Sequence, residues 1–203
     1  EDIFRSQLRA ILRASAHGHV EIMFPMISSV DEFLRAKEIT HGCMDELEDA
    51  GTPFNREIKI GTMVEVPSAA VVADQLAEHC DFFSIGTNDL IQYLLAVDRI
   101  NDRIAHLYRP FHPAVLRTIA GVITAGSRHG IPTAICGEMA ADPFYVPFFI
   151  GAGAAELSVN AASLPEIKYL VRRVELRSAK QLVDQVLALS DAAKIKTLLG
   201  EFF

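Results

Sequence analysis

Residues 82–90 read FFSIGTNDL, an apolar run that passes directly into polar residues. The part at 82–85 is apolar except for Ser84, and Asn88 and Asp89 follow it closely. A strand buried on both faces has this composition, because helices cover both faces of a parallel sheet and no clean alternation of apolar and polar residues results. The stretch therefore predicts a buried parallel strand with polar chemistry at its carboxyl end.

Four more segments share this apolar character, and helical patterns lie between them. Ser29 and Glu32 form a capping box that predicts a helix running towards Gly51. Pro113 suits a first helical turn, and the stripe after it ends at Gly130. Further helices are expected at the start of the chain, on a stripe of Ile3, Phe4, Leu8, Ile11 and Leu12, and over 164–199. The alternation predicts a βα repeat and a parallel sheet, with the other strands at 20–26, 58–66, 133–136 and 157–159.

Such a sheet is either an open doubly wound sheet or part of an eight-stranded (β/α) barrel. A barrel collects side chains from many strand ends on one face, whereas an open sheet concentrates them at one switch point. Here four strands end in polar or reactive residues, which favours the barrel. A full barrel takes about 250 residues, so this chain would supply about the last five strands. The strand-end residues are Glu65, Asn88, Asp89, Cys136, Glu138, Ser158 and Asn160.

Composition and charge exclude several classes of protein. The chain has 203 residues, of which 50% are hydrophobic and 22% charged, so it can form one large domain and is not disordered as a whole. With 19 basic and 26 acidic residues the net charge is -7, the wrong sign for covering a nucleic-acid backbone over a broad face. An anionic small ligand remains compatible with this charge, because a few arginines or a metal ion can bind it.

The sequence also bears on location. The longest uncharged stretch, 143–155, is interrupted by proline and glycine and is shorter than the roughly 18 residues that span a bilayer, so we expect no membrane span. Three cysteines at 43, 80 and 136 show no paired framework and no metal-ligand spacing, which fits a cytoplasmic protein. The chain opens with Glu1 and Asp2, without an initiator Met or a signal segment. We expect these residues to mark the point at which a longer protein has been cut.

Glu65 and Asp89 are the candidate metal ligands, because Mg²⁺ takes one or two carboxylates together with water and substrate oxygens. The alternative is that Glu65 is an ordinary strand-end acid and Asp89 caps a helix. Asn88 can present its amide, and the loop its N–H groups, to an anion at a helix start, although Asn is also a common turn residue. Arg99 offers a fork of donors to phosphate or carboxylate, against the alternative of a solvated cation at a helix end.

Cys136 ends an apolar strand, and Gly137 after it would let the backbone turn towards a cleft. A cysteine in this setting is either a small core residue or a reactive group. Cys43 and Cys80 lack even this context, and we interpret both as structural. Glu138 is a candidate only for supporting the site from behind the reacting groups.

Several of these segments together resemble the phosphoenolpyruvate-utilising family. The closer resemblance is to enzyme I of the bacterial sugar phosphotransferase system, and it extends from the first helix to about Asn160. Any one of the motifs alone would be weak, but their order along the chain makes the signal strong. The segments are GTMVEVP at 61–67, FFSIGTNDL at 82–90, VDR at 97–99 and ICGE at 135–138, with QLRAILRASA at 7–16 and MFPM at 23–26.

The resemblance implies a (β/α)8 barrel that binds phosphoenolpyruvate with Mg²⁺ and releases pyruvate, with residues 1–203 forming the C-terminal part of that barrel. It implies that Glu65 and Asp89 bind the metal, that Asn88, Asp89 and Arg99 bind substrate, and that Cys136 donates a proton. The phosphoryl group would pass to a histidine in an N-terminal domain and then to the carrier protein HPr, and the protein would be a homodimer. Because that histidine motif is not found here, we expect the chain alone to transfer nothing.

Three positions depart from the family pattern. Ile91 stands where Thr is common, and Ile100 and Ala141 stand where Gly is common, so the loops near Arg99 and Cys136 are expected to differ from those of the family. Two other functions stay open at this point. The same barrel motifs occur in pyruvate, phosphate dikinase and phosphoenolpyruvate synthase, and the isolated chain could be a dimerisation or binding module without turnover.

Overall fold

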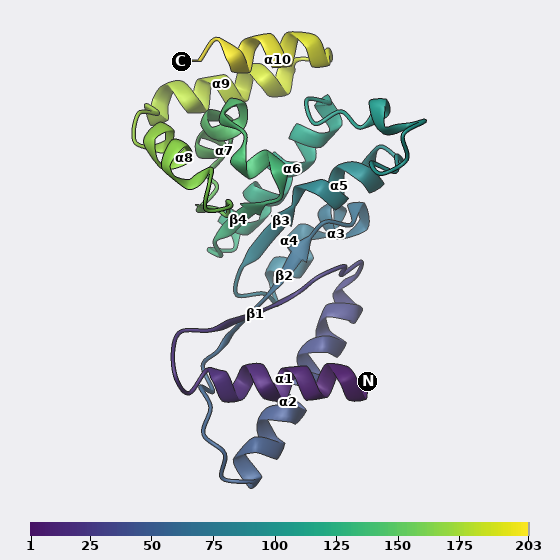
Figure 1. Cartoon of the computed structure of the whole chain (residues 1–203), viewed down its shortest axis with the longest axis vertical. Coiled ribbons are helices and arrows are strands. Elements are labelled where there is room, and N and C mark those ends of the chain that lie inside the picture. Colours follow the sequence, from purple (N-terminus) through teal and green to yellow (C-terminus); the bar gives the residue numbers. More distant parts are fainter. Residues whose placement is uncertain (203) are drawn as a thin grey trace.

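The computed structural model describes residues 1–202 as a parallel β-sheet surrounded by helices (Figure 1). All five expected strands are present. Their bounds are Glu21–Phe24 for β1, Lys59–Val64 for β2, Phe83–Gly86 for β3, Thr133–Cys136 for β4 and Glu156–Leu157 for β5.

Every pair of neighbouring strands is parallel, and the strands follow one another in chain order, β1-β2-β3-β4-β5. An open doubly wound sheet reverses its strand order at a switch point, whereas a barrel adds each new strand beside the last. The sequential order therefore matches an arc of a (β/α) barrel. The choice of barrel over open sheet, made from the polar strand ends, is confirmed.

Helices fill the connections, as the βα repeat requires. The α-helices are α1 (Asp2–Ala14), α2 (Val30–Asp49), α3 (Pro67–Val71), α4 (Ala73–Ala77), α5 (Thr87–Leu94), α6 (Pro113–Arg128), α7 (Val146–Ala152), α8 (Leu164–Val171), α9 (Leu176–Ala188) and α10 (Ala192–Gly200). Short 3-10 helices are η1 (Ala105–Leu107), η2 (Glu138–Ala141) and η3 (Pro143–Tyr145). In Figure 1, α1 and α2 lie beside β1 at one end of the molecule, and α8 to α10 gather at the other.

The predicted start of α2 is close to the observed one. Ser29 is its N-cap, and its hydroxyl accepts a hydrogen bond from the Glu32 backbone N–H at 3.2 Å. The returning half of the box is shifted, because Glu32 accepts from the backbone N–H of Ser28 at 2.8 Å rather than from that of Ser29. In α1, Leu8 and Leu12 are buried as the stripe predicts, but Ile3 is 86% exposed because it lies at the open end of the helix.

The last helices pack closely against the rest of the domain. Gly151 in α7 lies so near α9 that a methyl group in its place would come within 2.2 Å of the Ala179 carbonyl oxygen. On α9, Leu182 and Val186 are buried, and the Arg117 guanidinium of α6 donates to the Leu187 carbonyl at 2.9 Å. The C-terminal helices are thus part of the same packed body. Among residues 1–202 no helix combines the length and the apolar character needed to cross a membrane.

Candidate functional site

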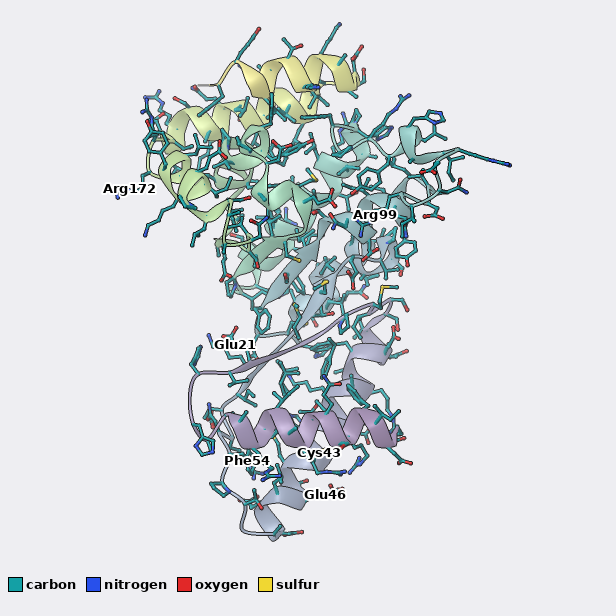
Figure 2. All side chains as sticks on the ribbon, in the orientation of Figure 1. Glu21, Cys43, Glu46, Phe54, Arg99 and Arg172 are labelled. Carbon is teal, nitrogen blue, oxygen red and sulfur yellow. The ribbon has the colours of Figure 1, made fainter. Side chains whose placement is uncertain are left out.

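The predicted site residues lie at the carboxyl ends of three neighbouring strands. Glu65 follows β2, Asn88 and Asp89 stand in the first turn of α5 after β3, and Cys136 ends β4. Because β2, β3 and β4 are parallel, these ends share one edge of the sheet. Arg99 lies after α5, in the loop region labelled at the upper right of Figure 2.

Glu65 is a buried carboxylate, with only 4% of the residue exposed. One carboxylate oxygen, Oε1, accepts a hydrogen bond from the backbone N–H of Met26 at 2.8 Å. The other, Oε2, lies against Gly86, where an added methyl group would come within 2.6 Å of it. Burial raises the pKa of Glu65, the Met26 hydrogen bond lowers it, and the charge of Asp89 raises it. Glu65 is therefore no ordinary exposed strand-end acid.

Asp89 does not cap the helix that contains it. The N-cap of α5 is Gly86, which makes no side-chain cap hydrogen bond, and Asp89 lies inside the first turn. The charge of Asp89 raises the pKa of Glu65, so the two carboxylates are close enough to interact electrostatically. This leaves the Asp89 carboxylate available for a cation.

A magnesium ion fits these two groups by their chemistry. A buried carboxylate is costly unless a proton or cation neutralises it, and a second carboxylate nearby makes a cation the better match. Within the described residues no group of three or more His, Cys, Asp and Glu side chains is placed to hold a metal. Glu65 and Asp89 would therefore need oxygens from substrate and water, which is the coordination Mg²⁺ favours.

Hydrogen bonds join the ends of β3 and β4. The Thr87 hydroxyl donates to the Cys136 carbonyl at 2.7 Å, and Asn88 Oδ1 accepts from the Glu138 backbone N–H at 3.0 Å. Gly137 between them has φ +89°, so the predicted backbone turn is present. The Asn88 side-chain oxygen is occupied by this hydrogen bond, whereas the N–H₂ group of the same side chain is a separate donor that can bind an anion.

Two hydrogen bonds hold Arg99 close to the residues that follow β4. Its guanidinium donates to Glu138 Oε1 at 3.1 Å, and its backbone N–H donates to Gln92 Oε1 at 3.2 Å. The Arg99 side chain is 35% exposed and that of Glu138 74%, so this ion pair is largely solvated and its exchange for another anion costs little. Glu138 thus contacts Arg99, the residue predicted to bind substrate.

Cys136 lies between two groups of β3. The Ser84 hydroxyl donates to Cys136 Sγ at 3.4 Å, and the thiol donates to the Ile85 carbonyl at 3.3 Å. Burial raises the pKa of the Cys136 thiol, the Ser84 hydrogen bond lowers it, and the charge of Glu65 raises it. The thiol is thus protonated at neutral pH, partly exposed and close enough to Glu65 to sense its charge.

The other two cysteines are buried, in keeping with a place in the core. Cys43 is fully buried between α1 and α2, where its thiol donates to the Arg5 carbonyl at 3.9 Å, and Figure 2 shows it in the lower part of the molecule, well away from Arg99. Cys80 is 6% exposed, and burial raises the pKa of its thiol to about 12.

Neither Ile100 nor Ala141 stands at a backbone position that requires glycine. Among the described residues, the non-glycine positions with positive φ are Met26 and Ala96, so neither Ile100 nor Ala141 needs glycine's conformational freedom. The loop differences expected from these two residues do not take the form of backbone strain at either position.

Three residues that hold the site together were not among the candidates predicted from the sequence. Ser84 and Thr87 lie within the 82–90 stretch and hold Cys136, while Met26 supplies the N–H that binds Glu65. Tyr108 is a fourth neighbour. Burial raises its pKa to about 12, and the charges of Glu138, Arg99 and Asp89 act on it.

Together, the fold and this edge define a class of protein: a parallel (β/α) barrel arc that presents acidic, amide, guanidinium and thiol groups at its strand ends. The family described as PEP-utilising enzyme, PEP-binding domain, matches residues 1–176, and the chain belongs to that family. This confirms the resemblance seen in the motifs.

Curated relatives extend the match to the whole chain. Phosphoenolpyruvate-protein phosphotransferases from Listeria monocytogenes and Bacillus subtilis are 44% and 43% identical over 100% of this chain, and that of Haemophilus influenzae is 49% identical over 99%. The chain spans 35% or 36% of the length of these relatives. A solved citrate lyase from Burkholderia xenovorans matches 97% of this chain and 66% of its own with a TM-score of 0.62, but at 17% identity it supports the fold alone.

Proposed function

We propose that this chain binds phosphoenolpyruvate at the carboxyl ends of β2, β3 and β4. In this proposal it forms the C-terminal part, residues 1–203, of the barrel of a phosphoenolpyruvate-protein phosphotransferase that acts in the cytoplasm. The observation that supports it is the meeting of Glu65, Asn88, Asp89 and Cys136 at one sheet edge, in a chain 43 to 49% identical to enzymes of that name.

Glu65 and Asp89 are the residues that would hold Mg²⁺. When bound, the ion would neutralise the anionic oxygens of the substrate and orient them. Glu65 contributes rigidity, because one oxygen is fixed by Met26 and the other is confined by Gly86. Asp89 contributes the second charge from the first turn of α5.

Asn88 and Arg99 serve the substrate itself. The Asn88 amide and the N-terminal turn of α5 offer N–H groups to an anion, and the helix dipole favours negative charge there. Arg99 exchanges its solvated partner Glu138 for the phosphate or carboxylate of the substrate, to which its planar fork can donate two parallel hydrogen bonds.

Cys136 supplies the proton that completes pyruvate. Once the phosphoryl group has left for a histidine of an N-terminal domain, the enolate of pyruvate remains, and its methylene carbon needs a proton. A thiol that is protonated at neutral pH can donate one, whereas an ordinary carboxylate cannot. The phosphohistidine would pass its group to HPr, and the complete protein would act as a homodimer.

The test uses the complete phosphotransferase that contains these residues. Cys136→Ala should bind phosphoenolpyruvate with unchanged affinity yet lose catalysed exchange of the pyruvate methyl protons with solvent deuterium, followed by NMR. Cys80→Ala is the matched control, since it removes a thiol that lies outside the site. Exchange at the wild-type rate in Cys136→Ala would assign the proton donor elsewhere, with Glu138 the first to examine.

A further inference from the structure

We propose that Ser84 is a positioning residue for the proton transfer, holding the Cys136 sulfur and stabilising it as its proton leaves. This inference rests on the proposed function, in which Cys136 protonates the enolate. It adds a residue that sits behind the reacting group and touches neither metal nor substrate.

The sheet register places the two side chains together. Gly86 of β3 pairs with Cys136 of β4, and Ser84 stands two residues earlier, opposite Ala134. Alternate residues of a strand point to the same face, so Ser84 and Gly86 share a face. Because Gly86 has no side chain, nothing on it stands between Ser84 and the sulfur, and the hydroxyl reaches Cys136 Sγ at 3.4 Å.

The hydrogen bonds give the thiol a defined orientation. Cys136 Sγ accepts from Ser84 and donates to the Ile85 carbonyl at 3.3 Å. Rotation about the Cβ–Sγ bond can turn the proton away from Ile85 and towards the site, while the sulfur stays in contact with the Ser84 hydroxyl. Ser84 is 7% exposed, so water has little access to replace this donor.

The chemistry of the step shows why this donor matters. The S–H bond breaks as a C–H bond forms at the methylene carbon, the electron pair of the enolate double bond makes the new bond, and the sulfur keeps its pair as a thiolate. Negative charge therefore moves from the enolate to the sulfur. A hydrogen bond to an ionised acceptor is roughly twice as strong as one between neutral groups, so the Ser84 bond strengthens during the step.

The surroundings otherwise oppose the thiolate. Glu65, facing Cys136 from the end of β2, is a carboxylate whose charge disfavours a second anion, and burial acts in the same direction. Ser84 is the neighbour whose hydrogen bond acts the other way. Its role is thus to offset part of this opposition, so that proton donation by Cys136 costs less.

A purely structural role for Ser84 is the competing explanation, and Thr133 provides the matched control. Thr133 is a 2% exposed residue of β4, and its hydroxyl has no hydrogen-bond partner among the described residues. Thr133→Val removes a buried hydroxyl from the same strand pair without touching the sulfur. Ser84→Thr retains the hydroxyl at the tested position.

The experiment compares these variants in the complete phosphotransferase. Ser84→Ala should slow exchange of the pyruvate methyl protons by roughly 10- to 100-fold, the effect of losing one hydrogen bond to a charged group, with KM for phosphoenolpyruvate unchanged. Ser84→Thr should restore most of the rate, and Thr133→Val should keep it. The infrared S–H stretching band of Cys136, isolated as the difference from Cys136→Ala, should move in Ser84→Ala and stay in Thr133→Val.

Two outcomes would overturn the inference alone: an unmoved S–H band in Ser84→Ala, or equal losses of exchange in Ser84→Ala and Thr133→Val. Unchanged exchange in Cys136→Ala would instead refute the part of the proposed function in which Cys136 donates the proton, and the role of Ser84 with it. The infrared band distinguishes these cases, because it reports the Ser84–Cys136 contact whether or not exchange occurs.

Discussion

Replacing Gly137 with alanine should disrupt the connection between the ends of β3 and β4. Gly137 has φ +89° and ψ -171°, a region that is essentially confined to glycine. An added methyl group would come within 2.4 Å of Thr87 Oγ1 and 2.9 Å of Asn88 Oδ1. These are the atoms that hold the Cys136 carbonyl and the Glu138 N–H.

The cost follows from these contacts. The backbone strain is about 1 to 3 kcal/mol. Each of the two hydrogen bonds is worth roughly 0.5 to 1.5 kcal/mol. If both are lost, Gly137→Ala lowers the free energy of unfolding by about 2 to 6 kcal/mol.

Two other glycines calibrate the measurement. Gly130 has φ +71° with no atom within 4 Å of an added methyl group, so alanine there costs only the backbone strain, about 1 to 2 kcal/mol. Gly121 is an exposed helical position with equally open space, where alanine should stabilise by about 0.5 to 1 kcal/mol. Urea unfolding followed by circular dichroism measures all three. Gly137→Ala no less stable than Gly130→Ala would refute the account of the Thr87 and Asn88 contacts.

Three further predictions concern charge and transfer. Burial raises the pKa of Glu65, so the folded chain binds that proton more tightly than the unfolded chain, and the resulting stability is present at low pH and lost as pH rises through the folded pKa. Glu65→Gln should therefore raise Tm at pH 7 in a chelator, and the gain should vanish in melts near pH 4; a gain that grows towards pH 4 contradicts this. In the complete phosphotransferase, Glu65→Ala and Asp89→Ala should each remove Mg²⁺-dependent phosphorylation of the carrier, and their effects should not add. The control Glu21→Ala, at an exposed residue at the far end of β1, should keep this activity. If the Asp89→Ala variant stays active, Asp89 is not a metal ligand. The 203-residue chain mixed with phosphoenolpyruvate, Mg²⁺ and carrier should transfer no phosphoryl group, and phosphorylated carrier on a gel would disprove this.

The sheet was predictable because each strand carries an apolar run bounded by polar residues. The residues at which the strands begin and end were less predictable. The fifth strand is expected at 157–159 but lies at Glu156–Leu157, because pairing with β4 rather than side-chain character decides where a short edge strand begins. On α2, Leu34 is 39% exposed although its neighbour Phe33 is fully buried, and apolar character alone does not separate the two.

The site was predictable as far as motifs name reacting groups. Glu65, Asn88, Asp89 and Cys136 do come to one edge of the sheet. The groups that hold them could not be found in this way, because the Met26 N–H that binds Glu65 is a backbone atom and is encoded by no side chain. Ser84 looks like one more residue of an apolar strand until the register shows what lies opposite.

The close approach of α7 and α9 shows that the stretch matched by the family and the packed body do not end at the same residue. The family match ends at 176, where α9 begins, yet Gly151 inside the matched region leaves just enough room for Ala179 beyond it. A chain shortened at that boundary would lose the helix against which α7 is shaped. The stretch that the family model matches is therefore shorter than the packed body to which it belongs, and truncations designed from that stretch should retain α9 and the α10 helix that packs on it.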